Sequence, residues 1–529
     1  MSNAYESAAA LRPHHLEPTD LRQLVRSFSL VPAPGTSQED VDGVMVTGVS
    51  VDSGDVAPGE LFVGLPGFKV HGASFAAQAV GAGAVAVVTD SQGAHLAADI
   101  PGTPVLVHED PRALVGPLSQ EVYHHPAEHL TATAVTGTNG KTTTSYFLDA
   151  MLAAHLGGCM VAGTVELRVG GTSVESPRTT VEAPVLARMM ALAVEEGVGA
   201  ASLEASSHAI VLHRLDGVIF DVVGFTNLQR DHLDFHKTME GYLEAKSRLF
   251  TPDHARSAVV CVDDRWGASL ARTASAAGLE VERVRAYPGD AECDWWVSDA
   301  AVSLAEAATT FTLHGPGAQE ISASCPLPGL VNVQNAALAL VMAIRAGVPA
   351  PTAVAALAGA HNIPGRMQRV SQRDGTRGLC IVDFAHTPDA MELALEAVRP
   401  ITPGRLIVVF GSDGDRDQGK RPMLGEVAAR LADVLVVTDE NPRSEDPQTI
   451  RDAVLAGVRR VRPDLADVEE VTTWRGDAVR RGVELCGPDD TVIVTGKGHE
   501  PFLEVADQFI RYNDAPVMRE AVEAKWGQA

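Results

Sequence analysis

The sequence predicts an α/β protein of three domains, in which apolar strands alternate with helices, and the central domain is expected to contain a parallel sheet covered on both sides. Short apolar runs that end in turn residues alternate with helical stretches along the 529 residues, which is the pattern of βαβ units. This length corresponds to roughly three or four domains. Apolar residues make up 45% of the chain and charged residues 21%, which is ordinary for a globular protein and excludes a coiled coil or general disorder.

Residues 1–128 are expected to form an N-terminal α/β domain. The apolar runs LFVGLPG (61–67) and AVAVVTD (84–90) flank an Ala-rich, helix-like stretch, and the Pro- and His-rich segment YHHPAEHL (123–130) is typical of a linker. The polar residues 1–20 contain no basic segment followed by an apolar run, so we expect a frayed extension and no secretory signal.

The second block, residues 129–364, opens with the most specific motif of the chain. In TATAVTGTNGKTTTSYF (131–147) an apolar strand leads through a Gly-rich turn into a helix. Such a turn lets backbone N–H groups approach phosphates, while Lys141 reaches the β- and γ-phosphates and Thr142 can ligate Mg²⁺. Position 135 is Val, so the full G-x-x-x-x-G-K-[ST] spacing is not met and a purely structural turn is the alternative. We predict ATP binding.

Two further segments of this block carry polar side chains after apolar strands. Glu204 in SLEASSHAI (202–210) suits a Mg²⁺ ligand beside a phosphate loop, although a buried histidine and a capping serine would also explain this segment. The segment 227–250 contains Asp-His-Leu-Asp-Phe-His and then Lys246 on a helix. Lys246 is either a snorkelling surface lysine or a desolvated amine that reacts with carbon dioxide to form an anionic, metal-ligating carbamate.

The third block, residues 365–529, repeats the alternation of strands and helices. The carboxyl ends of its strands carry DFAHTPD (383–389), GSDGDRDQGKRP (411–422), ENPR (440–443) and GKGHE (496–500). Ligands of open α/β sheets bind at that edge, and Arg416 and Arg421 could clamp a carboxylate through paired hydrogen bonds. Each loop alone could be a solvated surface loop, but together they predict a polar ligand site.

Charge and cysteine content narrow the class of protein. The net charge of −26 repels phosphate backbones and anionic lipid, and no window reaches the roughly 18 apolar residues of a membrane span. We therefore expect neither nucleic acid nor membrane as a partner. The six cysteines are scattered without a C-x-x-C, which argues against a structural zinc site or a disulfide framework and favours a cytoplasmic protein.

The motifs together resemble those of the Mur ligases, the ATP-dependent amide-forming enzymes of peptidoglycan precursor synthesis. The GTNGKT, EASSH, NLxxDHLDFH and DFAHTPDA segments stand in that family's order, and the resemblance covers roughly residues 45–515. It implies a UDP-sugar-binding first domain, a central P-loop-type parallel-sheet ATPase domain and a C-terminal Rossmann-like domain that supplies the amino acid. GDRDQGKRP, NPR and GKGHE are similar to the member that adds meso-diaminopimelate to UDP-N-acetylmuramoyl-L-alanyl-D-glutamate, a reaction that serves cell wall biogenesis, cell shape and cell division.

The resemblance also implies roles for individual residues. Lys141, Glu204, His232 and Lys246 would be catalytic. The ATP-binding set would be Gly137, Thr138, Asn139, Gly140, Lys141, Thr142, Thr143, Asn332, Asn335, Arg366, Asp383 and His386. Thr142 and Glu204 would hold one Mg²⁺, and His232 with carbamylated Lys246 a second. Asp52 and Ser53 would contact UDP, and Thr179, Thr180, Ser206 and Arg214 the muramoyl-dipeptide. The amino-acid site would comprise Arg416, Asn441, Pro442, Arg443, Gly496 and Glu500.

Two positions depart from the family pattern. Leu212 stands where many relatives carry Gln, which removes one polar contact. Residue 440 is Glu where the usual motif has Asp, although Asp439 precedes it. The retained Arg443 favours a substrate with a distal carboxylate, hence meso-diaminopimelate over L-lysine.

The alternatives are an L-lysine-adding or folylpolyglutamate-type ligase, a P-loop NTPase that uses ATP as a switch without ligation, and a nucleotide-sugar-binding scaffold. We expect a cytoplasmic monomer that takes UDP-N-acetylmuramoyl-dipeptide, ATP and meso-diaminopimelate, with two Mg²⁺ ions.

Overall fold

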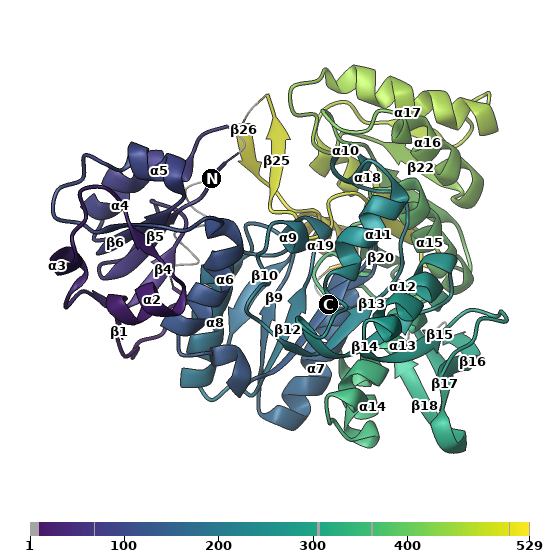
Figure 1. Cartoon of the computed structure of the whole chain (residues 1–529). Coiled ribbons are helices and arrows are strands. Elements are labelled where there is room, and N and C mark those ends of the chain that lie inside the picture. Colours follow the sequence, from purple (N-terminus) through teal and green to yellow (C-terminus); the bar gives the residue numbers. More distant parts are fainter. Residues whose placement is uncertain (1–9, 68, 304–306, 361–362, 507, 528–529) are drawn as a thin grey trace. The chain divides into compact units, whose positions relative to one another are not determined.

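The computed structural model describes residues 10–527 except 68, 304–306, 361–362 and 507 (Figure 1). It divides into two compact units. The first comprises Met1–Trp296, Gly315–Gly317 and Ala336–Ala356, and the second Val297–His314, Ala318–Asn335 and Leu357–Ala529. Within the described part of the chain, no helix is long and apolar enough to cross a membrane.

The N-terminal part of the first unit is a five-stranded sheet in the order β2-β7-β6-β5-β4. Its strands β4 to β7 are parallel and β2 is antiparallel to β7. The strands are β2 (Val31–Pro32), β4 (Gly48–Ser50), β5 (Glu60–Gly64), β6 (Ala86–Thr89) and β7 (Val105–Val107), and a separate pair joins β1 (Thr19–Asp20) to β3 (Met45–Val46). The helices are α2 (Leu21–Ser27), α3 (Gln38–Val41), α4 (Ala76–Gly81), α5 (Ser91–Leu96) and α6 (Pro111–Val122). Residues such as Val63, Val88 and Leu106 are fully buried, as expected of parallel strands covered on both faces.

The N-terminal extension differs from the frayed segment expected over residues 1–20. Residues 1–9 lie outside the described part, but Leu11 is fully buried and Arg12 forms ion pairs with Asp55 and Glu60. A buried carboxylate is costly without a cationic partner, so this arginine gives the extension a fixed position from Leu11 onward.

The central sheet of the first unit carries the phosphate-loop motif. Its strands run in the order β11-β10-β9-β12-β8-β13-β14-β15. Strands β9, β12, β8, β13, β14 and β15 run parallel to one another, whereas β10 is antiparallel to both β9 and β11. They are β8 (Thr131–Thr136), β9 (Cys159–Ala162), β10 (Glu166–Val169), β11 (Thr172–Glu175), β12 (Ala200–Glu204), β13 (Phe220–Phe225), β14 (Ala255–Cys261) and β15 (Glu280–Arg285). The helices are α7 (Lys141–Leu156), α8 (Ala183–Glu195), α9 (Ser207–Val211), α10 (Leu233–His236), α11 (Met239–Ser247) and α12 (Arg265–Ala276). Because β12, β8 and β13 are adjacent and parallel, the loops after them meet at one edge.

The second unit contains a six-stranded sheet in the order β19-β20-β24-β21-β22-β23. All its pairs are parallel except β19 with β20. The strands are β19 (Gln368–Ser371), β20 (Leu379–Val382), β21 (Leu406–Phe410), β22 (Val434–Val437), β23 (Val468–Glu470) and β24 (Thr491–Val494). The helices are α15 (Pro388–Val398), α16 (Lys420–Leu431), α17 (Pro447–Val461), α18 (Arg475–Leu485) and α19 (Asp514–Trp526). The predicted α/β architecture with a Rossmann-like C-terminal sheet is confirmed.

Smaller elements complete the fold. The strands β16 (Trp295–Ser303), β17 (Ala308–Gly315) and β18 (Gln319–Cys325) follow one another in sheet order, and α13 (Leu330–Arg345) and α14 (Ala350–Gly359) come next in the chain. The strands β25 (Phe502–Val505) and β26 (Gln508–Arg511) form an antiparallel hairpin, drawn in yellow in Figure 1.

All six cysteines are free thiols, and five of them are buried. Cys293, between β15 and β16, is partly exposed. Burial raises the pKa of the Cys159, Cys261 and Cys325 thiols.

Candidate functional site

The Gly-rich turn between β8 and α7 has the backbone geometry that its sequence predicts. Gly137 and Gly140 have φ of +149° and +89°, which side chains rarely tolerate. A Cβ atom on Gly137 would also lie 1.9 Å from the hydroxyl oxygen of Thr226. Glycine is therefore required at position 137 by both conformation and space.

This phosphate loop, residues 137–140, is held by the segment that follows β13. The Thr226 hydroxyl donates to the Asn139 carbonyl at 2.6 Å, and the Asn139 N–H donates to Asn227 Oδ1 at 3.1 Å. The backbone N–H of Gln229 donates to the Thr138 hydroxyl at 2.9 Å. Thr226, Asn227 and Gln229 were not among the predicted site residues, and the signal that could have found them is their place directly after an apolar run.

Lys141, Thr142 and Glu204 meet at the start of α7. The Lys141 ammonium donates to the carbonyls of Gly137 and Thr138 at 3.0 and 2.9 Å. The Thr142 hydroxyl donates to Glu204 Oε2 at 3.0 Å, and the carboxylate is 1% exposed. The N–H and hydroxyl of Thr164 also donate to this carboxylate, at 2.7 and 3.0 Å.

The pair of Thr142 and Glu204 fits a magnesium ion chemically. A hydroxyl and a carboxylate beside a phosphate loop are hard oxygen donors of the kind Mg²⁺ prefers. In the described residues no group of three or more His, Cys, Asp or Glu side chains is arranged to hold a metal, so a nucleotide's phosphate oxygens would have to supply further ligands.

Lys246 is a fully buried amine at the end of α11, with 1% of its surface exposed. Its Nζ donates to the Gly137 carbonyl at 2.9 Å and to the Thr136 hydroxyl at 3.3 Å. Burial, reinforced by the charge of Lys141, lowers the pKa of Lys246 well below its usual value. A neutral amine has two N–H donors for these two acceptors and keeps its lone pair for a reaction. The snorkelling alternative is excluded.

His232 lies in the same region, in the left-handed conformation with φ of +52°. Its ring stands edge-on to that of His208, with centroids 5.0 Å apart. Partial burial lowers the pKa of His232, and the charges of Lys141 and Lys246 act in the same direction against the attraction of Asp231. The histidine is therefore a neutral nitrogen donor at neutral pH.

The four residues expected at the dipeptide end gather beside Glu204. The Thr180 hydroxyl donates to the Glu204 carbonyl at 2.7 Å and accepts from the Ser206 N–H at 3.0 Å. Arg214 donates to the Thr180 carbonyl at 3.1 Å. Thr179 is linked to the same group, because its hydroxyl lies 3.2 Å from the Thr164 hydroxyl, which can accept a hydrogen bond from it.

Asp52 and Ser53 line a cavity of about 430 Å³ in the first unit. Arg112, Arg178 and Glu182 contribute charged side chains to its wall, and Arg178 is paired with Glu182 at 2.8 Å. The apolar part of the wall includes Phe62, Val70 and Phe75. A cavity with arginines and apolar surface can hold both the phosphates and the base of a nucleotide. Arg112, Arg178 and Glu182 were not among the predicted site residues.

Arg366, Asp383 and His386 are brought together in the second unit around the ring of Phe384. The Arg366 guanidinium lies 4.2 Å from the ring centroid, and the His386 ring centroid lies 4.6 Å from it. Asp383 accepts from the Met367 N–H at 2.7 Å, and burial raises the pKa of its carboxyl group.

Asn332 and Asn335 lie apart from this group on α13. The Asn332 amide donates to the Pro328 carbonyl at 2.8 Å, and Asn335 is 3% exposed. Among the described residues, no hydrogen bond joins either asparagine to Arg366, Asp383 or His386.

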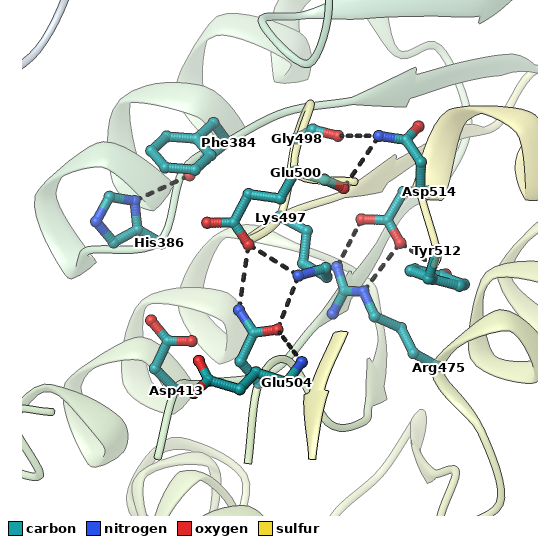
Figure 2. A network of polar contacts seen from close by, with 12 residues as sticks. Phe384, His386, Asp413, Arg475, Lys497, Gly498, Glu500, Glu504, Tyr512 and Asp514 are labelled. Atoms are coloured by element: carbon teal, nitrogen blue, oxygen red, sulfur yellow. Dashed lines mark hydrogen bonds and ion pairs between the residues drawn. The ribbon is translucent and has the colours of Figure 1, made fainter. Parts of the chain in front are cut away.

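Asn441, Arg443 and Glu500 come together beyond β22 and β24. Figure 2 shows Glu500 and Glu504 in this part of the second unit. The Asn441 amide donates to Glu500 Oε2 at 3.1 Å. Arg443 donates to Glu504 Oε2 and to the Gly414 carbonyl, both at 2.8 Å. Pro442 lies between Asn441 and Arg443 in the chain, and its carbonyl approaches Gly414 so closely that a Cβ there would be 1.9 Å away.

Glu440, the residue before Asn441, is buried, and Gly496 makes room for it. Glu440 is 2% exposed, and a Cβ atom on Gly496, whose φ is +111°, would lie 2.6 Å from Glu440 Oε2. Burial and the negative charge of Asp413 raise the pKa of Glu440 to about 8. The preceding Asp439 is instead paired with Arg451.

The two arginines of segment 411–422, which were expected to clamp a carboxylate of the ligand, have different surroundings. Arg421 is 2% exposed and donates to both oxygens of Glu445, at 2.9 and 2.7 Å. Because its guanidinium is already neutralised inside the protein, the prediction for Arg421 is wrong. Arg416 is exposed, and the described residues give it no hydrogen bond to Asn441, Arg443 or Glu500.

The chain was compared with known proteins. Three family models match it: "Mur ligase family, catalytic domain" over residues 45–123, "Mur ligase middle domain" over 135–343, and "Mur ligase, glutamate ligase domain" over 365–498. The UDP-N-acetylmuramoyl-L-alanyl-D-glutamate–2,6-diaminopimelate ligase of Streptomyces avermitilis is 41% identical over 98% of this chain and 99% of its own length. The UDP-N-acetylmuramyl-tripeptide synthetase of Leifsonia xyli subsp. xyli is 44% identical with the same coverage.

A solved structure of a ligase with the same name as the Streptomyces relative is also similar to this chain. A UDP-N-acetylmuramoyl-L-alanyl-D-glutamate–2,6-diaminopimelate ligase is 31% identical, with a TM-score of 0.65, covering 91% of this chain and 95% of the other.

Proposed function

This chain belongs to the Mur ligase family, and from that premise we propose that it joins meso-diaminopimelate to UDP-N-acetylmuramoyl-L-alanyl-D-glutamate at the expense of ATP. It is an ATP-dependent, amide-bond-forming ligase of peptidoglycan synthesis. The observation that carries the assignment of roles is the meeting of Lys141, Thr142, Glu204 and Lys246 around the phosphate loop.

In the first step the γ-carboxylate of the D-glutamyl residue attacks the γ-phosphorus of ATP. An acyl phosphate forms and ADP leaves. The backbone N–H groups of residues 137–143 hold the phosphates, and Lys141, which contacts two loop carbonyls, turns toward the γ-phosphate to neutralise its charge. Thr180, Ser206 and Arg214 hold the dipeptide end, while Asp52 and Ser53 hold the UDP end.

Two magnesium ions would neutralise the charge that develops in this step. Thr142 and Glu204 would hold one. His232 and Lys246 would hold the other, with Lys246 as its carbamate. The neutral amine of Lys246 forms this group when its lone pair attacks the carbon of carbon dioxide: a C–N bond forms and one proton is lost. Its depressed pKa and its buried setting support this role.

In the second step the amine of meso-diaminopimelate attacks the acyl carbon, and the products are an amide, inorganic phosphate and a proton. The distal ammonium and carboxylate of meso-diaminopimelate would be bound by Asn441, Arg443 and Glu500, with Pro442, Gly496 and the exposed Arg416. Arg366, Asp383, His386, Asn332 and Asn335 would serve the ATP side. The protein mainly positions the reactants and keeps water away from the acyl phosphate.

The proposal also includes the domain bounds, the cellular location and the oligomeric state. The domains would cover residues 1–128, 129–364 and 365–529, which is compatible with the segments matched by the three family models. The enzyme would act in the cytoplasm, and it would act as a monomer.

The test is phosphate release from ATP with UDP-N-acetylmuramoyl-L-Ala-D-Glu and either meso-diaminopimelate, L-lysine or no amino acid. Release that requires meso-diaminopimelate, with a tripeptide product by mass, is expected. Phosphate release that requires L-lysine instead would support the ligase activity but contradict the proposal that Arg443 binds a distal carboxylate. Release indifferent to both amino acids would indicate a switch-type NTPase.

A further inference from the structure

A buried cation lies between two residues of the proposed amino-acid site. Lys497 follows β24, and its side chain is 0% exposed. Its ammonium donates to Asn441 Oδ1 at 2.9 Å and to Glu500 Oε2 at 2.8 Å (Figure 2). Burial of an ammonium is costly unless it is paired and hydrogen-bonded, so these two contacts offset the cost of removing the charge from water.

The contact with Lys497 fixes which way the Asn441 amide points. Asn441 Oδ1 accepts from Lys497 and also from the backbone N–H of Glu504, at 3.2 Å. A flipped amide would set its own N–H donors against these two donors, which is strongly unfavourable. The Asn441 NH₂ group is thereby directed at Glu500 Oε2, to which it donates at 3.1 Å.

The two carboxylate oxygens of Glu500 have different surroundings. Oε2 accepts from both Lys497 and Asn441, whereas Oε1 has no hydrogen bond among the described residues. The Glu500 side chain is 36% exposed. One oxygen is thus fixed by the protein, and the other is available to a ligand that carries an ammonium group.

Lys497 differs from a lysine that only stabilises the fold. Its ammonium donates to two side chains, and both belong to the proposed amino-acid site. Lys525, in contrast, donates to three backbone carbonyls, those of Val483, Glu484 and Cys486, at 2.9, 2.8 and 2.6 Å. The backbone of the two strand ends is held separately, because Arg475 donates to the carbonyls of Asp439 and Thr495.

We propose that Lys497 is a positioning residue that sets the amino-acid specificity of this ligase. It locks the Asn441 amide and one oxygen of Glu500, so that the other oxygen meets the distal ammonium of a diamino acid in a single geometry. This inference rests on the proposed function, and it concerns a residue that does not itself touch the substrate.

The test uses the full-length Lys497→Met variant, which keeps the volume of the side chain and removes its charge. Asn441 keeps its bonds to Glu504 and Glu500, and Glu500 can be hydrated, so no buried charge is left unpaired. We expect the KM for meso-diaminopimelate to rise about 10- to 100-fold, as when an outer partner of a ligand-binding residue is removed. The KM for ATP and for the UDP-dipeptide should stay unchanged, and the preference for meso-diaminopimelate over L-lysine should shrink.

Two companion variants separate positioning from folding. Lys525→Met removes a lysine from the same unit and should lower the thermal midpoint while leaving the KM for meso-diaminopimelate unchanged. The double variant Lys497→Met/Glu500→Gln should lose no more affinity than the weaker-binding single variant, because the lysine acts through that carboxylate. Additive losses, or an equal rise of all three KM values in Lys497→Met, would overturn the proposal.

Failure of the proposed role of Lys497 can be distinguished from failure of the proposed function. If the wild-type protein makes no tripeptide with any amino acid, the proposed function is wrong. The role of Lys497 can then be tested without enzyme activity, from the NMR resonances of the Asn441 side-chain amide. These resonances are assigned by their loss in Asn441→Asp. A single slowly exchanging NH₂ pair that broadens in Lys497→Met would support it. Resonances that Lys497→Met leaves unchanged would overturn it.

Discussion

Lys246 and Glu440 are ionisable side chains whose burial shifts their pKa toward the uncharged form, one in each compact unit. Lys246 lies against the phosphate loop with two acceptors for its N–H groups. Glu440 lies against Gly496, and its Oε2 has no hydrogen-bond partner among the residues that the structure describes. The protonation of Glu440 therefore depends on pH, and under the proposed function the carbamylation of Lys246 depends on carbon dioxide.

Replacement of Lys246 by alanine should remove most of the ligase activity, by about 100-fold or more in kcat, since a proposed metal-holding group is lost. Short carboxylic acids such as acetate should restore part of the activity, because they can occupy the space of the missing carbamate. Lys525→Ala is the matched control and should keep its activity. Full activity of Lys246→Ala, without any added acid, would refute the carbamate role.

Glu440 should make the stability of the folded protein fall as pH rises. Its pKa is about 8 in the folded protein against an ordinary 4.5, so the folded state holds a proton that the unfolded state releases. The corresponding stabilisation is present in full below about pH 4.5 and is lost as pH rises toward 8. Glu440→Gln should therefore raise the free energy of unfolding relative to wild type at pH 8 and change it little at pH 4.5. Urea unfolding at both pH values measures this, and an equal difference at the two would contradict it.

At the scale of secondary-structure elements, the ion pair of Arg475 and Asp514 joins the first residues of α18 and α19. Both side chains are 0% exposed, and the guanidinium nitrogens lie 2.9 and 2.8 Å from the two carboxylate oxygens. The Tyr512 hydroxyl donates to the same carboxylate at 2.8 Å (Figure 2). This network holds the two helices to the strand ends that carry Asn441 and Glu500.

Removal of one partner of this pair, by Arg475→Met or Asp514→Asn, should cost about 3–5 kcal/mol of unfolding free energy, because the other is left as a buried, uncompensated group. Arg481→Met is the matched control. Its partner Glu469 and the arginine itself are about 40% exposed, and such surface pairs are worth less than about 1 kcal/mol. Similar losses in the two unfolding curves would show that burial of the pair does not decide its contribution.

The strands of the second unit were predictable, because parallel strands buried on both faces are near-continuous apolar runs. Leu379–Val382, Leu406–Phe410 and Thr491–Val494 are such runs. The partners of long charged side chains were not predictable. Arg421 and Arg416 stand in the same loop, and only the tertiary contact with Glu445 makes one of them structural. Lys497 was visible only as part of GKGHE, since its role depends on two partners from separate loops.

At the scale of the whole molecule, the proposed substrate contacts are shared between the two units. The first holds the phosphate loop, Lys246 and the cavity beside Asp52, and the second holds the network around Asn441. Each unit has its own buried sheet, so each can be stabilised by its own ligand.

Hydrogen exchange should distinguish stabilisation of the first unit by its ligand from stabilisation of the second unit by its ligand. UDP-N-acetylmuramoyl-L-Ala-D-Glu at 100 times its Kd should stabilise the first unit by about 2.7 kcal/mol, which slows its most protected amides about 100-fold. The strands around Asp52 and Thr180 should respond, and those around Asn441 should respond to meso-diaminopimelate instead. Mass spectrometry of exchanged peptides localises the effect. Protection of the first unit alone by meso-diaminopimelate would contradict the division.

The distribution of thiols has a practical consequence for such measurements. Five of the six cysteines are buried, and Cys293 alone is partly exposed. A maleimide dye applied to the native protein should therefore attach at a single position, between β15 and β16, without any engineered cysteine. Lys246 and Lys497 would be untouched by this chemistry, so a fluorophore at Cys293 could report on the protein while leaving the proposed sites intact.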